Sequence, residues 1–328
     1  MKISSQKMAK VVVILLLSVA LCSCAGQKGK QIEKGTIKSN TTWSGQILVK
    51  GDVEIAKGAT LTVTPGTVIR FVRIASHGPA NLYDEITAKN FAFERAELII
   101  RGKLIARGTK DKMIVFTSAE GTPKPGDWGA INFQDSTDNI IQYCEISYAD
   151  TGVHGHGVQV AVGDCNLHDN AVAIGFKNVE RYVTEGSMNI VNNRIVGNGG
   201  GVLCGKGTRS AITHNEISDN KIYGIFGKKA YSCYVRFNNI VRNEKGIILY
   251  DTKGCRISQN NIADSVQYNV SLLEGQTWDV DARNNWWGTK DTNKIRSMIW
   301  DKDEESRLGR VIFSDLASSP IQDAGLTK

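Results

Sequence analysis

A segment of about twenty-two residues recurs through the second half of the chain, and this period restricts the possible folds more than any other feature. Seven triplets align, with first residues 21, 28, 22, 23, 22 and 24 positions apart. They are CEI, CNL, NRI, NEI, NNI, NNI and NNW, beginning at Cys144, Cys165, Asn193, Asn215, Asn238, Asn260 and Asn284. A period of this length is typical of a solenoid, in which each repeat buries its apolar face against its neighbours.

Each repeat has the pattern strand, polar turn, strand. Apolar and often β-branched residues alternate with polar ones in short runs such as IVGNGGGV and ISDNKIYGI. This alternation predicts strands, and helical spacing is not sustained. A leucine-rich repeat needs several leucines at fixed places, and a propeller blade is about twice as long. We therefore predict an all-β chain, a single-stranded parallel β-helix (solenoid) of about ten rungs.

The recurring asparagines are predicted to be structural. Residues at the same place on successive rungs lie about 4.8 Å apart, so a buried amide can hydrogen-bond to the amide or backbone of the next rung. A second set with the same spacing is Asn170, Asn198, Asn220 and Asn243. The main ladder is predicted to consist of Asn193, Asn215, Asn238, Asn260 and Asn284.

The N-terminal segment has the features of an export signal. Lys2, Lys7 and Lys10 precede an apolar stretch too short to span a bilayer. The stretch ends in LCSC, which resembles the lipobox of bacterial lipoproteins and implies lipidation (palmitate) at Cys24; an ordinary signal peptide cut nearby is the alternative. We assign residues 1–23 to the signal peptide, 24–35 to a lipidated tether and 36–328 to the β-helix domain.

Three further stretches carry a resemblance to a known family, and together with the repeats they cover nearly the whole mature chain. They are TTWSGQILVKGDVEIAKGATLTVTPGTVIRF, LIIRGKLIARGTKDKMIVFTS with PGDWGAINF, and ARNNWWGT. With the repeats, they resemble the right-handed parallel β-helix repeat proteins of the pectin-lyase-like superfamily. The resemblance implies a right-handed coil and a cap at NNWWG over the last rung. It does not imply one activity, because this fold carries many functions.

The charge argues against a nucleic-acid partner. The formal net charge is +7, and removing the three lysines of residues 1–23 leaves +4. Nucleic-acid binding normally needs a clustered basic patch. The resemblance to bacterial lipoproteins implies a membrane partner through the lipid anchor at Cys24. With Ala25 after that cysteine, it also implies an outer-membrane lipoprotein on the periplasmic or the surface face. No cofactor is expected.

Two histidines alternate with glycine in VHGHG. His154 and His156 would point the same way in a strand, joined by His168 one rung later. Three imidazoles could hold a metal, but a glycine-rich turn with solvated histidines explains the same pattern, so we predict no metal site. The Gly-His-Gly element resembles that of polygalacturonases, yet paired carboxylates are missing nearby. We therefore predict no catalytic residues.

The rung of 28 residues predicts a loop that bulges from the rod. Such insertions are where binding usually resides. A second insertion spans residues 73–95. The candidate ligand-binding residues are Glu180, Arg181, Tyr182 and Glu185 of the long rung, together with His154 and His156.

The cysteines leave two alternatives. Cys144 and Cys165 share one ladder position, and Cys233 and Cys255 share another. Their expected spacing of about 4.8 Å is within the disulfide range, but parallel Cβ directions are unfavourable, which favours buried thiols.

We predict a non-catalytic cell-envelope lipoprotein that binds carbohydrate or another surface polymer. The alternative is a polysaccharide lyase or hydrolase.

Overall fold

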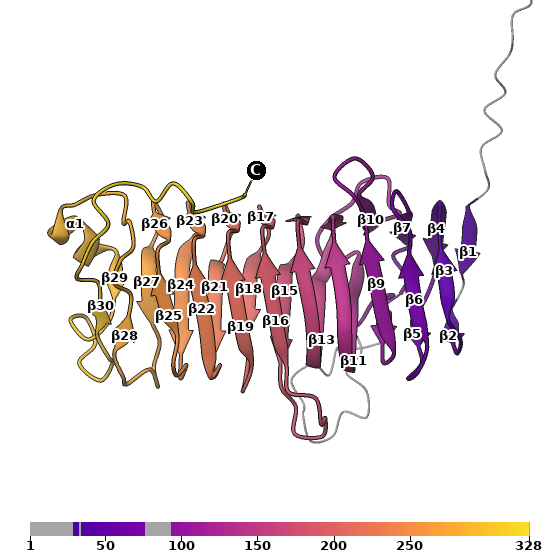
Figure 1. Cartoon of the computed structure of the whole chain (residues 1–328), viewed down its shortest axis with the longest axis horizontal. Coiled ribbons are helices and arrows are strands. Elements are labelled where there is room, and N and C mark those ends of the chain that lie inside the picture. Colours follow the sequence, from indigo (N-terminus) through magenta and orange to yellow (C-terminus); the bar gives the residue numbers. More distant parts are fainter. Residues whose placement is uncertain (1–28, 33, 76–92, 328) are drawn as a thin grey trace, which may run out of the picture.

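The computed structural model describes residues 29–32, 34–75 and 93–327, which form a rod of stacked coils (Figure 1). All the strand pairings between named strands are parallel, as the repeat predicts. One of them joins β12 (Cys144–Ser147) to β14 (Asn166–His168) in the ladder region. The chain is a right-handed parallel β-helix with three walls. Signal peptide, Cys24 and most of the loop at 73–95 lie outside the described residues.

The first wall is one sheet of ten strands, which agrees with the predicted number of rungs. Its order is β1 (Lys30–Ile32), β4 (Gln46–Val49), β7 (Val68–Phe71), β10 (Ile114–Ser118), β12 (Cys144–Ser147), β14 (Asn166–His168), β17 (Arg194–Val196), β20 (Glu216–Ser218), β23 (Asn239–Val241) and β26 (Asn261–Ala263).

The second wall contains the candidate site. Its strands are β2 (Gly35–Ile37), β5 (Val53–Ile55), β8 (Leu98–Ile100), β11 (Trp128–Gln142), β13 (Ala149–Gly163), β15 (Val172–Lys177), β18 (Gly200–Cys204), β21 (Tyr223–Lys228), β24 (Lys245–Tyr250), β27 (Tyr268–Leu272) and β29 (Ile299–Trp300). The long strands β11 and β13 bend and continue into the third wall.

The third wall is completed by shorter strands. They are β3 (Thr41–Trp43), β6 (Thr60–Val63), β9 (Lys103–Arg107), β16 (Ser187–Val191), β19 (Arg209–Thr213), β22 (Ser232–Arg236), β25 (Arg256–Ser258), β28 (Val280–Asp281) and β30 (Val311–Ile312). The one helix in the described part is α1 (Thr292–Ser297), capped by Asp291. No helix in that part is long and apolar enough to cross a bilayer.

The core is built by columns of equivalent apolar side chains. In each strand, side chains alternate between the inside and outside of the rod. In the first wall the inward column is continuous and fully buried: Ile146, Leu167, Ile195, Ile217, Ile240 and Ile262. Because every rung buries one member against the next, the apolar contacts follow the rod axis.

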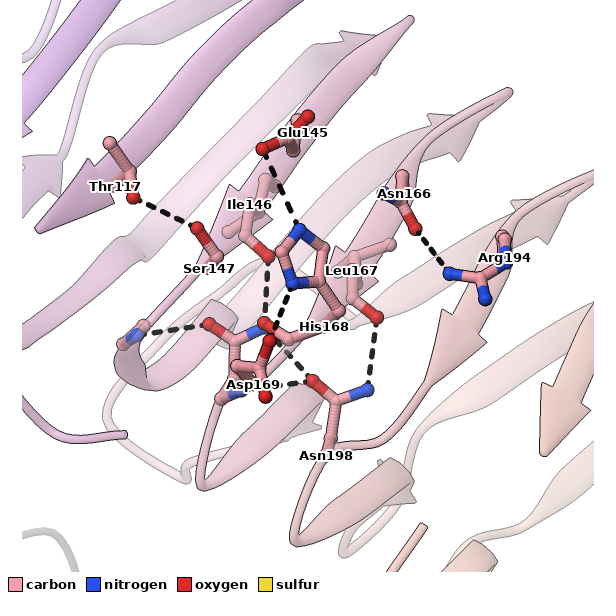
Figure 2. A network of polar contacts seen from close by, with 12 residues as sticks. Thr117, Glu145, Ile146, Ser147, Asn166, Leu167, His168, Asp169, Arg194 and Asn198 are labelled. Atoms are coloured by element: carbon pink, nitrogen blue, oxygen red, sulfur yellow. Dashed lines mark hydrogen bonds and ion pairs between the residues drawn. The ribbon is translucent and has the colours of Figure 1, made fainter. Parts of the chain in front are cut away.

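The asparagine ladder runs beside this column. The Oδ1 atom of Asn215 accepts from both the backbone and the side-chain nitrogen of Asn193, at 2.9 and 3.0 Å. The same pair of bonds joins Asn215 to Asn238 and Asn238 to Asn260. The second set forms its own ladder in the same way, with Asn198 also donating to the Leu167 carbonyl, 3.0 Å away (Figure 2).

The assignment of Asn284 to the ladder is wrong by one residue. Asn285 is the buried member that accepts from Asn260, at 2.9 and 3.0 Å, whereas Asn284 is exposed. Asn284 has a φ of 58°, like Gln259 one rung earlier, and this left-handed position precedes each ladder residue. Asparagine tolerates that conformation, so the Asn-Asn pair suits both places.

Two other expectations change. The rod begins within the assigned tether, because β1 at Lys30–Ile32 pairs with β4 and Ile32 packs against the core. Cys233 and Cys255 form a disulfide, with Cα atoms 4.6 Å apart, so free thiols were the wrong expectation there. Cys255 lies before the first residue of β25, so strand pairing does not fix its Cβ direction. Cys144 and Cys165 are buried free thiols.

Candidate binding site on the second wall

A cavity of about 440 Å³ opens on the outer face of the second wall. His154 and His156 lie in β13, and Gly155 separates them, so both side chains leave the rod on the same side. The two rings meet edge to face, with centroids 4.6 Å apart. The remaining lining residues are Asp150, Thr151, Val172, Gly175, Phe176, Lys177, Leu203, Gly205, Lys206, Lys228 and Lys229.

A chain of buried polar groups orients His154. Asn132 of β11 donates its side-chain N–H to Glu97 Oε2, at 2.8 Å. Its Oδ1 atom therefore faces His154, whose Nδ1 lies 3.0 Å away. An amide oxygen only accepts, so Nδ1 carries the proton and donates, and Nε2 is left as an acceptor. The chain thus fixes one tautomer of His154 at the cavity.

The surroundings keep both histidines neutral. Burial, followed by the positive charge of Lys177, lowers the pKa of His154 to about 3. Burial also lowers the pKa of His156, with smaller contributions from His154, Lys177 and Arg181. The expectation of solvated histidines in a turn is therefore wrong, since both residues belong to a strand and His156 is fully buried.

The cavity is cationic because of lysines from three successive rungs. Lys177 ends β15, Lys206 follows β18, and Lys228 ends β21, with Lys229 next to it. Lys206 forms an ion pair with Glu180, at 2.9 Å. Asp150 is the one acidic side chain among the described residues that line the cavity.

The loop of the long rung packs against the histidine strand. Tyr182 donates its hydroxyl to the Gln134 side chain, at 3.3 Å, and Thr184 donates to Asp135, at 2.9 Å. Gly157 has a φ of 57°, and a Cβ there would lie 2.9 Å from the Cβ of Tyr182. Only glycine allows this close approach.

The candidate residues named from the sequence are brought together in part. His154 and His156 line the cavity. Tyr182 and Arg181 are neighbours in the loop, with the guanidinium 5.1 Å from the ring centre. Glu180 reaches the cavity only through its ion pair with Lys206, and Glu185 is exposed and does not line it.

His168 does not join the other histidines. It lies in β14 of the first wall, where its ring stands between Glu145 and Asp169, at 3.6 and 2.8 Å (Figure 2). The contact with Glu145 raises the pKa of His168, and the hydrogen bond with Asp169 adds to this rise. The alternative in which His168 joins the other two imidazoles is therefore wrong, because the chain turns between His156 and His168 into another wall.

Sequence reasoning missed the lysines, Asn132 and Glu97. The lysines are spread over more than fifty residues, and only the register of the coils brings them together. Two positions carried a signal: Lys177 and Lys228 each end the apolar strand that follows a ladder asparagine. The insertion at 73–95 also contributes Phe93, whose ring lies edge-on to His154, at 5.0 Å.

Comparison with solved structures found two that are similar to this chain. No curated protein matches the sequence. A variant of the periplasmic alginate epimerase AlgG has 9% identity over 85% of this chain and 76% of its own, with a TM-score of 0.44. The A-module of the mannuronan C-5 epimerase AlgE6 from Azotobacter vinelandii has 13% identity over 79% of this chain and 78% of its own, with a TM-score of 0.42.

Two family models cover most of the chain between them. The model described as Pectate-lyase like beta helix domain matches residues 35–140. The model described as Periplasmic copper-binding protein (NosD) matches residues 126–297, which include the cavity, the asparagine ladder and the disulfide. Because this second match spans just over half of the sequence, the chain belongs to the NosD family.

Proposed function

We propose that this protein is a non-catalytic cell-envelope protein that binds an acidic polysaccharide in the cavity of the second wall. The observation that carries the proposal is the convergence of four lysines and two neutral histidines on one cavity. Lysine ammonium groups attract carboxylates, and the accepting Nε2 of His154 suits a sugar hydroxyl. Leu203 and Val172 supply apolar surface beside these groups.

The proposed location is the periplasmic side of the envelope. The family description and the alginate epimerase AlgG both name periplasmic proteins. Lipidation of Cys24 would anchor the rod to the outer membrane, since two or more acyl chains hold a protein stably. Mass spectrometry of the N-terminal peptide tests this, and an unmodified Cys24 in the mature protein would exclude the anchor.

The family description also raises copper, and the cavity does not fit a copper ion. The described residues contain no group of three or more histidine, cysteine or acidic side chains placed to hold a metal. His154 and His156 are adjacent, but the charge of Lys177 that lowers both of their pKa values would equally oppose a bound cation. The thiols of Cys144 and Cys165 are buried inside the rod. The cavity favours an anion.

Binding is tested with the full-length protein and oligogalacturonates as the acidic probe, measured by calorimetry. We expect Lys177→Gln and Lys228→Gln to weaken binding by about three- to tenfold each, the effect of about 1 kcal/mol per lost charge contact. Lys302→Gln, an exposed lysine beyond the cavity, is the control and should leave the affinity unchanged. Equal binding of a neutral oligosaccharide would contradict the proposal.

A second candidate function is cleavage of the same acidic chain by β-elimination. The specific observation in its favour is the fixed tautomer of His154, because a neutral imidazole with a free Nε2 lone pair can accept a proton from carbon next to a carboxylate. Ultraviolet absorbance of unsaturated sugar ends would reveal the products. Their absence with a polymer that binds leaves the non-catalytic function, and their appearance, lost in His154→Gln, replaces it.

A further inference from the structure

The lysines of the cavity continue along the rod on the edge where the second wall turns into the third. Lys177 is the last residue of β15, and Lys206, Lys229 and Lys253 lie on the turns that follow β18, β21 and β24. We propose that this edge, the lysine track, binds a linear acidic polysaccharide lengthwise, so that the cavity is one end of a longer site. The inference rests on the proposed function and adds that the ligand spans several rungs and lies parallel to the rod axis.

Backbone contacts show that the four turns are stacked. Asn178 N–H donates to the Lys206 carbonyl at 2.8 Å, and Gly207 N–H donates to the Lys229 carbonyl at 2.9 Å. Lys253 N–H donates to the Ala230 carbonyl at 3.0 Å, which joins the third and fourth turns. Three rung spacings separate Lys177 from Lys253, so the track is about 14 Å long along the axis.

Aromatic rings lie between the lysines. The ammonium group of Lys229 is 5.7 Å from the ring centre of Tyr250, and that of Lys253 is 4.9 Å from the ring of Trp278. Tyr231, on the turn after β21, is 62% exposed. Rings with an apolar face and a polar edge suit sugar rings, and cations beside them suit the attached carboxylates.

Acidic groups on this edge offset part of the lysine charge. Glu180 pairs with Lys206, and Asp251 lies one rung from Lys229, because Lys228 pairs with Tyr250. Lys177, Lys228 and Lys253 add further positive charge on the same turns, so lysines outnumber these two acidic groups. On the next rung the charge changes sign, since Glu274 and Asp279 lie on the turn after β27 and Glu274 pairs with Arg307, at 3.6 Å. The cationic edge therefore ends at Lys253 on that side, which gives the track a defined length.

An elongated polyanion matches this geometry better than a compact one. A single sugar acid can contact the cavity lysines but cannot reach Lys253, three rungs away. A chain parallel to the rod axis meets one or more lysines on every rung it crosses. Once one sugar of the polymer is bound, the next sugars are held near the neighbouring lysines, so their binding is effectively intramolecular. The affinity therefore grows with the number of rungs that the polymer contacts.

The test compares a galacturonate dimer with a hexamer on the full-length protein, by calorimetry. We expect the hexamer to bind more tightly. The variant Lys253→Gln, at a lysine outside the lining of the cavity, should weaken the hexamer by about threefold, the effect of one exposed charge contact, and leave the dimer unchanged. Lys177→Gln should weaken both. The control, Lys294→Gln with Lys302→Gln, removes two exposed lysines elsewhere and should change neither.

Each of the other possible outcomes would contradict one part of the proposal. A hexamer that binds no more tightly than the dimer, or a Lys253→Gln variant that binds the hexamer unchanged or weakens both oligomers equally, overturns the track and leaves the cavity as the site. No binding of either oligomer overturns the proposed function, and the track with it. Stronger competition by anionic lipid vesicles or by an oligonucleotide of equal charge overturns the assignment to a polysaccharide. Unchanged melting temperatures show that the variants are folded.

Discussion

His154 Nδ1 lies 3.0 Å from the side-chain oxygen of Asn132 on the preceding rung. This contact connects the cavity to Glu97, a fully buried carboxyl group just before β8. Burial raises the pKa of Glu97 well above its usual value, and the hydrogen bond from Asn132 opposes the rise. Asn132 therefore supports both a buried acid and the orientation of the site histidine.

Replacing Asn132 by leucine tests this connection. Asn132→Leu removes the donor to Glu97 and the acceptor for His154, so two buried polar groups lose a partner. We expect the free energy of unfolding to fall by about 2–4 kcal/mol, measured by urea denaturation. Asn189→Leu, at an exposed position of the third wall, is the control and should change stability by less than about 0.5 kcal/mol. Equal effects would contradict a structural role for the Glu97–Asn132–His154 chain.

The lowered pKa of His154 predicts loss of stability in acid. Because the folded pKa is about 3, the unfolded chain binds more protons between that pH and the unfolded pKa of about 6.5. Stability contributed by neutral His154 is therefore present above about pH 6.5 and is lost as the pH falls below it. The expected slope is up to about 1.4 kcal/mol per pH unit.

Urea denaturation at pH 7 and pH 5 measures this slope. The variant His154→Gln should have a shallower loss between the two values than the unmodified protein. His168→Gln should change the profile in the opposite sense, because the raised pKa of His168 contributes stability at low pH that is lost as the pH rises. An unchanged profile in His154→Gln would show that the residue titrates alike in both states.

The asparagine ladder predicts a large cost for a small substitution. In Asn238→Ala, the bonds from Asn215 and to Asn260 are lost, together with the bond to the Ile212 carbonyl. Since these groups are buried, we expect about 2–4 kcal/mol of lost stability in urea denaturation. Asn189→Ala, which is exposed, should cost less than about 0.5 kcal/mol. A cost for Asn238→Ala within that smaller range would mean that the ladder adds little to stability.

The disulfide predicts a redox-dependent stability. Cys233 and Cys255 close a loop with a sequence separation of 22 residues. A bridge of that span stabilises by about 3 kcal/mol in the chain-entropy model. The double variant Cys233→Ser, Cys255→Ser should therefore melt at a lower temperature, and reductant should lower the melting temperature of the unmodified protein but not that of the double variant. Cys204→Ser, a free buried cysteine, serves as the comparison and should remain sensitive to reductant.

The fold could be predicted from the sequence because its determinants are local and repeated. A column such as Ile195, Ile217 and Ile240 can be recognised from the repeat period and from the alternation of apolar and polar residues. Each repeat that shows the same pattern supports the assignment of the others. The errors in the prediction occur where the backbone conformation of a single residue decides its place in the rung. Asn284 and Asn285 are the same amino acid, and only the left-handed φ of Asn284 assigns them to turn and ladder.

The site could be predicted only in part. Alternation along one strand placed His154 and His156 on the same side, because that relation needs no long-range information. His168 was misplaced, since the turn that sends it into the first wall lies between it and His156. Glu97 and Asn132 were missed because a hydrogen bond across rungs leaves no mark on the local pattern.

The sequence by itself determined that the chain coils with a rung of about twenty-two residues, since that period is written into every repeat. Tertiary structure decided what the outer surface can bind. Lys177, Lys206, Lys229 and Lys253 are spread over four repeats, and stacking of the coils, with about 4.8 Å between rungs, brings them to one edge. A local sequence pattern shows which side of a strand a residue faces, whereas the charge of a surface depends on which rungs become neighbours.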